Sequence, residues 1–224
     1  MPNPVCPVPA DSVVTVAAKA MPMFPLGTVL FPNAVLPLQV FEPRYRELTE
    51  SCLRGDGRFG VVLIERGFEV GGGDTRFSVG TVARIVEAAR TPDGRYLLAT
   101  VGTDRLRVRR WLDDDPYPRA EVDIVGEPKR AKNGAIERRD AVERLLKRSL
   151  ALHAELGERG APVDAAQLDA DPLRASFEAA AMAPIGALDA QQLLELDDPV
   201  DRLARLEQVL VEAVEVMQFR LAEG

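Results

Sequence analysis

The stretch that decides the fold of this 224-residue chain is residues 24–48, FPLGTVLFPNAVLPLQVFEPRYREL. Three prolines divide it into short apolar runs, and a proline inside a helix costs about 3 kcal/mol because it lacks the backbone donor and crowds the preceding turn. The runs Val29–Phe31 and Leu38–Phe41 therefore predict two short strands. Pro43 then predicts the start of a helix, because its fixed φ suits the first helical position and apolar residues follow at helical spacing.

Four pieces of this stretch, in this order and spacing, resemble the opening of the Lon N-terminal domain family. The pieces are Phe24-Pro25-Leu26, Val29-Leu30-Phe31-Pro32, Leu36-Pro37-Leu38 and Phe41-Glu42-Pro43-Arg44-Tyr45, followed by Phe59-Gly60-Val61-Val62-Leu63. A looser likeness at Gln192–Glu195 and Arg202-Leu203 extends the resemblance over about residues 21–222. This family is the substrate-binding domain of the Lon protease and also occurs in stand-alone proteins. The resemblance implies a PUA-like β pseudo-barrel with one embedded helix, followed by a small α-helical bundle.

The pattern between residues 59 and 125 has a period of two, which indicates β-strands. We expect strands at Gly60–Ile64, Phe77–Glu87, Tyr96–Val101, 105–110 and 119–124, with a loop at Gly71–Asp74 and a turn at Thr91–Gly94. With the two strands before Pro43, the count reaches about seven short strands. That number fits a closed or nearly closed barrel-like sheet.

After Pro128 the apolar pattern takes the period of a helix. We expect helices over Gly134–Leu156, Leu173–Met182, Leu188–Leu196 and Pro199–Leu221, with Asp171 and Asp189 as N-caps. The predicted fold class is therefore α+β with segregated parts. We expect a disordered tail at 1–20, a β-barrel subdomain at 21–128 and a helical-bundle subdomain at 129–224, with Met21 or Met23 as alternative natural starts.

Bulk properties exclude several classes of protein. The formal net charge of −7 argues against a general nucleic-acid binder, which needs clustered Lys and Arg. No apolar run approaches the roughly 20 residues that span a membrane, and the first twenty residues lack the pattern of a secretory signal. The two cysteines, Cys6 and Cys52, are too few for a disulfide framework, so the cytoplasm is the expected compartment.

The residues that carry chemistry are scarce, and we expect no catalytic, cofactor or metal site. Gly71–Gly73 is not followed by the lysine of a phosphate-binding loop. Lys147 and Ser149 are two positions apart on a predicted helix, so they point in different directions and do not form a catalytic dyad. A single histidine, His153, with two separated cysteines makes neither a triad nor a metal site.

A stripe of arginines on one predicted strand allows two interpretations. It consists of Arg105, Arg107, Arg109 and Arg110. The stripe could hold an acidic partner or nucleic acid. The favoured interpretation is a solvated face that pairs with Glu121 and Asp123 on the next strand.

The residues of the opening motif are interpreted as scaffold. Its residues are Phe24, Pro25, Leu26, Phe31, Pro32, Pro37, Leu38, Phe41, Glu42, Arg44 and Tyr45. Glu42 favours the positive end of the helix dipole, and Arg44 can bridge back to a strand carboxylate. Phe68, Trp111 and Tyr117 fall at strand ends and loops, where an aromatic side chain either anchors a partner or covers the barrel, and they are the candidate protein-binding residues.

The resemblance implies a non-enzymatic protein-binding module without ATPase or peptidase parts. Its expected partners are unfolded or degron-bearing proteins, which would bind in a groove between the barrel and the helical bundle. An adaptor or regulatory subunit that docks on an ATP-dependent protease is the alternative. RNA binding through the barrel is a less favoured alternative that rests on fold analogy alone. Peptidase activity is not expected, because the sequence offers no pair of a nucleophile and a base.

Overall fold

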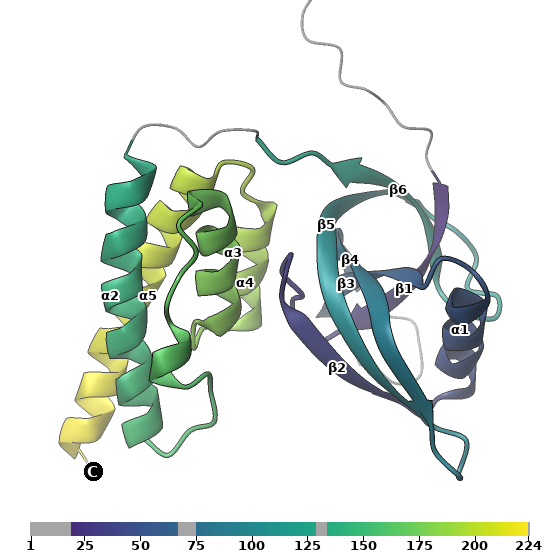
Figure 1. The fold of residues 1–224 in the computed structure, drawn as a ribbon, viewed down its shortest axis with the longest axis horizontal. Coiled ribbons are helices and arrows are strands. Elements are labelled where there is room, and N and C mark those ends of the chain that lie inside the picture. The colour runs from purple at the N-terminus through teal and green to yellow at the C-terminus, as the bar shows by residue number, and fades with distance from the viewer. Residues whose placement is uncertain (1–18, 67–74, 129–133, 224) are drawn as a thin grey trace, which may run out of the picture.

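The computed structural model describes residues 19–66, 75–128 and 134–223 (Figure 1). The strands are β1 (Lys19–Leu26), β2 (Val35–Val40), β3 (Arg58–Arg66), β4 (Thr75–Arg90), β5 (Tyr96–Trp111) and β6 (Arg119–Val125), and helix α1 (Pro43–Arg54) lies between β2 and β3. The helical half contains α2 (Ala135–Glu155), the 3-10 turn η1 (Val163–Ala165), α3 (Pro172–Met182), α4 (Ala187–Glu195) and α5 (Pro199–Glu223). The two halves stand side by side, which confirms an α+β fold with segregated parts.

The sheet is mixed, and its pairings close on themselves. The strand order is β2-β5-β4-β3-β1-β6, and β6 pairs with β5 as well as with β1. The pair β1–β3 is parallel and the other pairs are antiparallel. The first part of the long strand β5, residues 96–101, pairs with β2, whereas residues 105–111 pair with β6. Five strands therefore form a ring of pairings, and β2 lies beside that ring as an edge strand.

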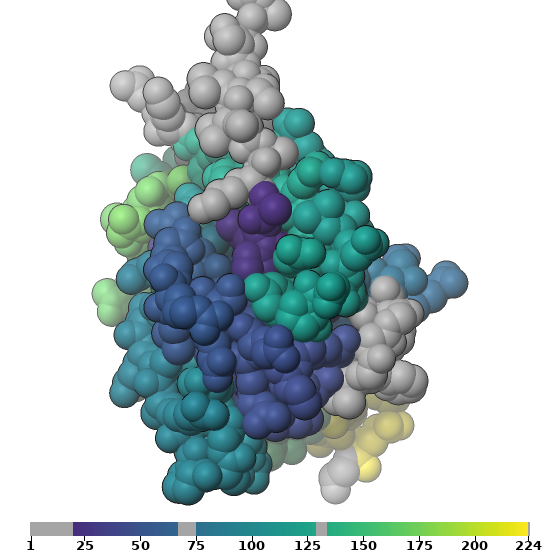
Figure 2. All heavy atoms as spheres, turned by 90° about the vertical axis from the view of Figure 1, so that its right-hand side faces the viewer, coloured from purple at the N-terminus to yellow at the C-terminus, as the bar shows by residue number. Residues whose placement is uncertain are grey.

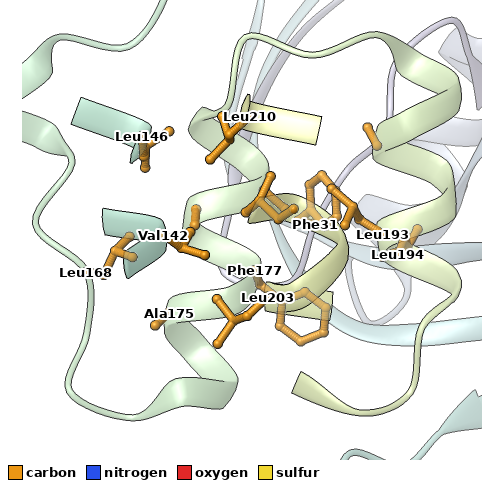
Figure 3. Packing of buried hydrophobic residues seen from close by; sticks show 14 of the residues in the cluster. Phe31, Val142, Leu146, Leu168, Ala175, Phe177, Leu193, Leu194, Leu203 and Leu210 are labelled. Carbon is orange, nitrogen blue, oxygen red and sulfur yellow. The ribbon is translucent and has the colours of Figure 1, made fainter. Parts of the chain in front are cut away.

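The prediction of a strand at Val29–Phe31 is wrong, because this segment leaves the sheet and reaches into the helical half. The hydroxyl of Thr81 donates to the carbonyl oxygen of Leu30 at 2.5 Å, which holds the segment against β4. The Phe31 side chain then enters the helical core, where its ring centroid lies 6.4 Å from that of Phe177 (Figure 3). Phe31, the last residue of an apolar triplet that precedes Pro32, thus packs into the core of the helical half.

Two further differences concern strand limits. Strand β1, which the sequence pattern does not predict, begins at Lys19. Residues 1–18 lie outside the described residues, so the predicted tail stays a prediction. The segments predicted as separate strands at 96–101 and 105–110 form one continuous strand, β5. Without the strand at Val29–Phe31, with these two segments merged and with the unpredicted β1 added, the described residues contain six strands where about seven are expected. The predicted loop at Gly71–Asp74 also lies outside the described residues.

The helices begin and end close to the predicted positions. Helix α1 starts at Pro43, and in α3 the Asp171 carboxylate accepts a hydrogen bond from the Leu173 amide at 3.1 Å, as expected of an N-cap. Asp189 is not the cap of α4, because Gly186 occupies that position and Asp189 lies within the first turn. Apolar side chains three or four positions apart on α5 are buried, namely Leu203, Leu206, Leu210 and Met217. Along the described residues, no helix is both long and apolar enough to cross a membrane.

Candidate functional site

An elongated hollow surface lies where the β1–β2 connection and the start of β2 face helices α3 and α4. We call it the junction groove. It consists of two hollows of about 290 and about 410 Å³, which share Ala34, Val35 and Ala181. The remaining lining is largely small or apolar, and Ile185 is its largest aliphatic member from the helical side.

The sheet side of the junction groove is fixed by hydrogen bonds to β5. The Asn33 amide donates to the Gly102 carbonyl, and the Gly102 amide donates to the Ala34 carbonyl, both at 2.9 Å. A side chain at Gly102 would place its Cβ 2.2 Å from the Phe31 carbonyl oxygen, so only glycine allows this close approach. The next residue, Val35, begins β2 with 67% of its surface exposed. A largely exposed apolar side chain is thus held beside the groove.

A buried arginine of the sheet half holds the opposite wall. Arg105 is 1% exposed, and its Nη1 donates to the carbonyl oxygens of Leu194 at 3.0 Å and Leu196 at 3.1 Å. Its guanidinium also pairs with the carboxylates of Glu127 and Asp197. The prediction that Arg105 belongs to a solvated stripe is therefore wrong. The end of α4 presents carbonyls without helical partners at the negative end of the helix dipole, and a buried cation satisfies them.

A second buried arginine, on α5, binds the same end of α4. Arg202 donates through Nε to the Leu193 carbonyl at 3.2 Å and through Nη1 to the Ser176 hydroxyl at 2.7 Å. Its guanidinium carbon lies 3.8 Å from the ring centroid of Phe177. Burial, followed by the nearby positive charge of Arg105, lowers the pKa of Arg202 to about 10, so the side chain stays charged at neutral pH. Two arginines from the two halves thus fix α4 against β5, and with it the junction groove.

The rest of the arginine stripe follows the prediction. Arg109 pairs with Asp123, and Arg110 Nη2 lies 2.6 Å from Glu121 Oε1 on the neighbouring strand β6. Hydrogen bonding and charge attraction from Asp123 raise the pKa of Arg109, which is exposed to solvent. The stripe is therefore divided by burial: one arginine joins the halves, and the two near the end of β5 form surface pairs.

The two candidate aromatic residues that the structure describes, Trp111 and Tyr117, do not line the junction groove. Trp111 is half-buried at the end of β5, where the guanidinium of Arg76 stands 4.6 Å from its ring centroid. Tyr117 is half-buried and lines a hollow with Glu47 and Glu50 of α1. Figure 2 shows the side of the sheet half that carries α1. The two aromatics pack against different core clusters, and Phe68 lies outside the described residues. Contact of these residues with a partner stays a prediction.

The opening motif combines buried and exposed side chains around a second hollow. Phe24 and Tyr45 are 8% and 4% exposed, and their rings stack with centroids 4.1 Å apart. Phe41, in contrast, is 55% exposed, and Pro37 is exposed on β2. We call the hollow of about 200 Å³ between the end of β1 and β2 the seam hollow. It is lined by Phe24, Leu26, Pro37, Leu38, Gln39, Val40, Phe41, Glu42 and Tyr45.

The polar residues of the motif interact locally. Arg44 Nε donates to Glu42 Oε2 at 3.1 Å and forms a pair at the start of α1. A bridge from Arg44 to a strand carboxylate stays a prediction. The Arg44 guanidinium also stands 4.6 Å from the Tyr45 ring centroid. Sequence spacing alone did not reveal that these residues surround a hollow, because β1 and β2 meet only in the folded sheet.

The groups with potential chemistry are engaged in structural contacts. His153 places Nδ1 2.9 Å from Glu158 Oε2, and Lys147 Nζ pairs with Glu143 at 2.5 Å on the same helix. Cys52 is buried, and burial, with the charge of Asp56, raises the pKa of its thiol to about 12. Over the described ranges, no three His, Cys, Asp or Glu side chains cluster as a metal site requires.

Comparisons with known proteins point in one direction. A family model described as the ATP-dependent protease La (LON) substrate-binding domain matches residues 20–212. Lon protease 2 of Herpetosiphon aurantiacus is 30% identical over 217 residues, which cover 93% of this chain and 26% of the relative. The Lon protease of Koribacter versatilis is 29% identical over 212 residues, which cover 91% of this chain and 25% of the relative. The chain thus spans about a quarter of the length of these relatives.

Two solved structures share the fold. One is the Lon N-terminal domain protein from Xanthomonas campestris, with a TM-score of 0.63, 28% identity, and coverage of 84% of this chain and 96% of that chain. The other is the N-terminal domain of the Mycobacterium avium complex Lon protease, with a TM-score of 0.63, 19% identity, and coverage of 88% and 98%. The second likeness concerns the fold alone.

Proposed function

Because the chain belongs to the LON substrate-binding domain family, we propose that it binds unfolded or degron-bearing polypeptides through the junction groove. The observation that carries this proposal is a groove of mainly small, uncharged residues whose two walls come from different halves of the molecule and are held in place by Arg105 and Arg202. Burial of exposed apolar surface is the driving force for such binding, and a polar rim restricts it.

The charge distribution supports an apolar polypeptide as the ligand. Among the described residues that line the two hollows of the junction groove, Glu178 is the only charged one, and its carboxylate accepts a hydrogen bond from the Asp169 amide at 2.9 Å. An almost uncharged groove selects for apolar side chains without selecting one sequence, which is what recognition of unfolded chains requires. The net charge of −7 opposes binding of nucleic acid.

A titration with a permanently unfolded protein tests this proposal. The probe is fluorescently labelled, reduced and carboxymethylated α-lactalbumin, and the readout is fluorescence anisotropy. We expect saturable binding to the wild-type protein and at least about tenfold weaker binding to a Val35→Asp variant, because a carboxylate at the rim must lose water on binding. The matched control is Ile124→Asp, which adds the same charge at a residue 48% exposed on β6. Equal binding by both variants would contradict the location, and absence of binding by the wild type would contradict the function.

A second surface favours the alternative of an adaptor that docks on an ATP-dependent protease. Val216 and Phe219 on α5 are 59% and 63% exposed, and Val216 borders a hollow of about 300 Å³ that includes Ile185 and Met217. Large exposed apolar side chains grouped on one helix are typical of protein interfaces. A pull-down from the host with the wild type and a Phe219→Ser variant tests this function. One stoichiometric partner that the variant loses would support it, and an identical set of partners would contradict it.

We further propose that the module is non-enzymatic, acts in the cytoplasm, and uses the closed ring of strand pairings as a PUA-like pseudo-barrel. The family match supports the first point, since it describes a substrate-binding domain. Peptide-hydrolysis assays with and without ATP should give only the background rate. Hydrolysis that copurifies with the protein and persists in a second, independent preparation would contradict this point.

A further inference from the structure

Strand β2 has an open edge. Among the described strands, β2 pairs with β5 alone, through residues 35–40. Its second edge borders the seam hollow, which separates it from the end of β1. An open edge presents backbone donors and acceptors that another extended chain can bond.

The pairing with β5 determines which residues of β2 present their backbone at the open edge. The Gly102 amide donates to the Ala34 carbonyl, and in an antiparallel pair the bonded residues alternate along the strand. Leu36, Leu38 and Val40 therefore bond to β5, whereas Val35, Pro37 and Gln39 point their backbone groups away from it. Proline at position 37 agrees with this phase, because it has no donor to offer to β5.

The open edge of β2 runs from the junction groove to the seam hollow. Val35 lines the junction groove at the start of β2, and Phe41 lines the seam hollow just after its end. Six residues of strand span roughly 20 Å, so an extended segment along β2 would contact both the junction groove and the seam hollow. A compact ligand or a helix would use neither the length of this edge nor its backbone groups.

The seam hollow has the character of a pocket for one apolar side chain. Phe24, Leu26 and Tyr45, each less than 10% exposed, form its floor, and the exposed Phe41 stands at its rim. A volume of about 200 Å³ accepts one large aliphatic or aromatic side chain. Such a pocket beside a strand edge is the arrangement by which proteins bind extended peptides through added strands.

We propose that an extended apolar polypeptide segment adds as a strand to the open edge of β2 and places one large apolar side chain in the seam hollow. This inference rests on the proposed function and names its mode of recognition. The carbonyls of Val35, Pro37 and Gln39 accept bonds from the added strand, and the amides of Val35 and Gln39 donate. Pro37 withholds a donor at the centre, which restrains the pairing of β2 with a second copy of itself.

Amide hydrogen exchange, followed by NMR, tests the inference without any variant. The probe is a short, end-blocked peptide of alternating leucine and threonine with a lysine at each end, and a peptide of the same composition in shuffled order is the control. We expect the alternating peptide to slow exchange at the amides of Val35 and Gln39 by at least about tenfold. The amides of Leu36 and Leu38 should change little, because they already bond to β5. The shuffled peptide should protect none of these amides to the same degree.

A gain-of-function variant gives an independent readout. Pro37→Val supplies the missing donor at the open edge, and we expect it to bind the alternating peptide about two- to tenfold more tightly than the wild type does. Pro92→Val, in the exposed turn between β4 and β5, is the matched control and should leave binding unchanged.

The outcomes separate this inference from the proposed function. Binding of unfolded α-lactalbumin without binding of the alternating peptide would overturn strand addition and leave the proposed function standing. Peptide binding without protection of Val35 and Gln39 would do the same. If neither probe binds, the proposed function fails, and the inference fails with it.

Discussion

Replacement of Phe31 by alanine should destabilise the protein strongly and separate the unfolding of its two halves. Phe31 is 2% exposed and lies among the helical residues although it comes from the β1–β2 connection (Figure 3). Loss of its buried ring removes about 1.5–3 kcal/mol of transfer free energy. A phenyl-sized void adds about 2 kcal/mol at about 24 cal/mol per Å³. The expected loss of about 3–5 kcal/mol is a large part of the stability of a typical domain, about 5–15 kcal/mol.

Urea unfolding followed by two probes measures this effect. The single tryptophan, Trp111, reports on the sheet half by fluorescence, and far-ultraviolet circular dichroism is dominated by the helices. In the wild type the two transitions should coincide, whereas in Phe31→Ala the helical signal should be lost at lower urea concentration. Phe219→Ala is the matched control, because Phe219 is 63% exposed and its truncation should cost less than about 0.5 kcal/mol. A decrease of less than about 1 kcal/mol in the free energy of unfolding of Phe31→Ala would refute the claim that Phe31 joins the two halves. Coincident unfolding transitions in this variant would refute it as well.

Three further predictions use matched pairs or a chemical probe. Gly102→Ala should lower the free energy of unfolding by about 2–3 kcal/mol, measured by thermal unfolding, since its Cβ would lie 2.2 Å from a backbone oxygen. The control Gly126→Ala meets no atom within 4 Å and should be nearly neutral. Equal losses of stability in the two variants would contradict this prediction. Arg105→Gln should cost about 3–5 kcal/mol, because the half-buried Glu127 carboxylate and the carbonyl groups at the end of α4 lose their buried cation. The exposed Arg107→Gln should cost less than about 0.5 kcal/mol. Urea unfolding measures both, and a small loss at Arg105 would show that its contacts with α4 are dispensable. Cys52 should resist a thiol reagent at mildly alkaline pH until urea unfolds the protein, because burial raises the pKa of its thiol to about 12 and keeps it protonated; mass spectrometry of labelled peptides reads the result, and rapid labelling of the folded protein would disprove it.

Those parts of the fold that depend on local patterns were predictable from the sequence. The start of α1 at Pro43 and the buried stripe of α5 follow from residues a few positions apart, whose spacing fixes helix and face. The strand prediction at Val29–Phe31 fails, because an apolar triplet between prolines has the same sequence pattern whether it pairs in a sheet or packs into a second core. Arg105 was misread for a related reason: its alternation with apolar residues indicates a wet face, but its carbonyl partner on Leu194 is 89 positions away.

The candidate site was predictable in its place but not in its residues. A groove between the two halves was expected, and the described residues contain hollows there. The side chains that line it, such as Val35 and Ile185, carry no signal in the sequence, because isolated aliphatic residues are equally common in cores. The opening motif was interpreted as scaffold, which fits the buried Phe24 and Tyr45 but misses the open hollow beside Phe41. Exposure of that kind depends on which strands fail to pair, and sequence periodicity does not report it.

Site-specific photocrosslinking at Val35 tests most directly whether this chain binds unfolded polypeptide through the junction groove. A photoreactive phenylalanine analogue replaces Val35 in one variant and the similarly exposed Ile124 in the control. Each variant is irradiated with reduced, carboxymethylated α-lactalbumin or with the native, disulfide-bonded form of the same protein. The account predicts crosslinks from position 35 to the unfolded form alone and few from position 124. Equal crosslinking from both positions, or to both forms of α-lactalbumin, would contradict it.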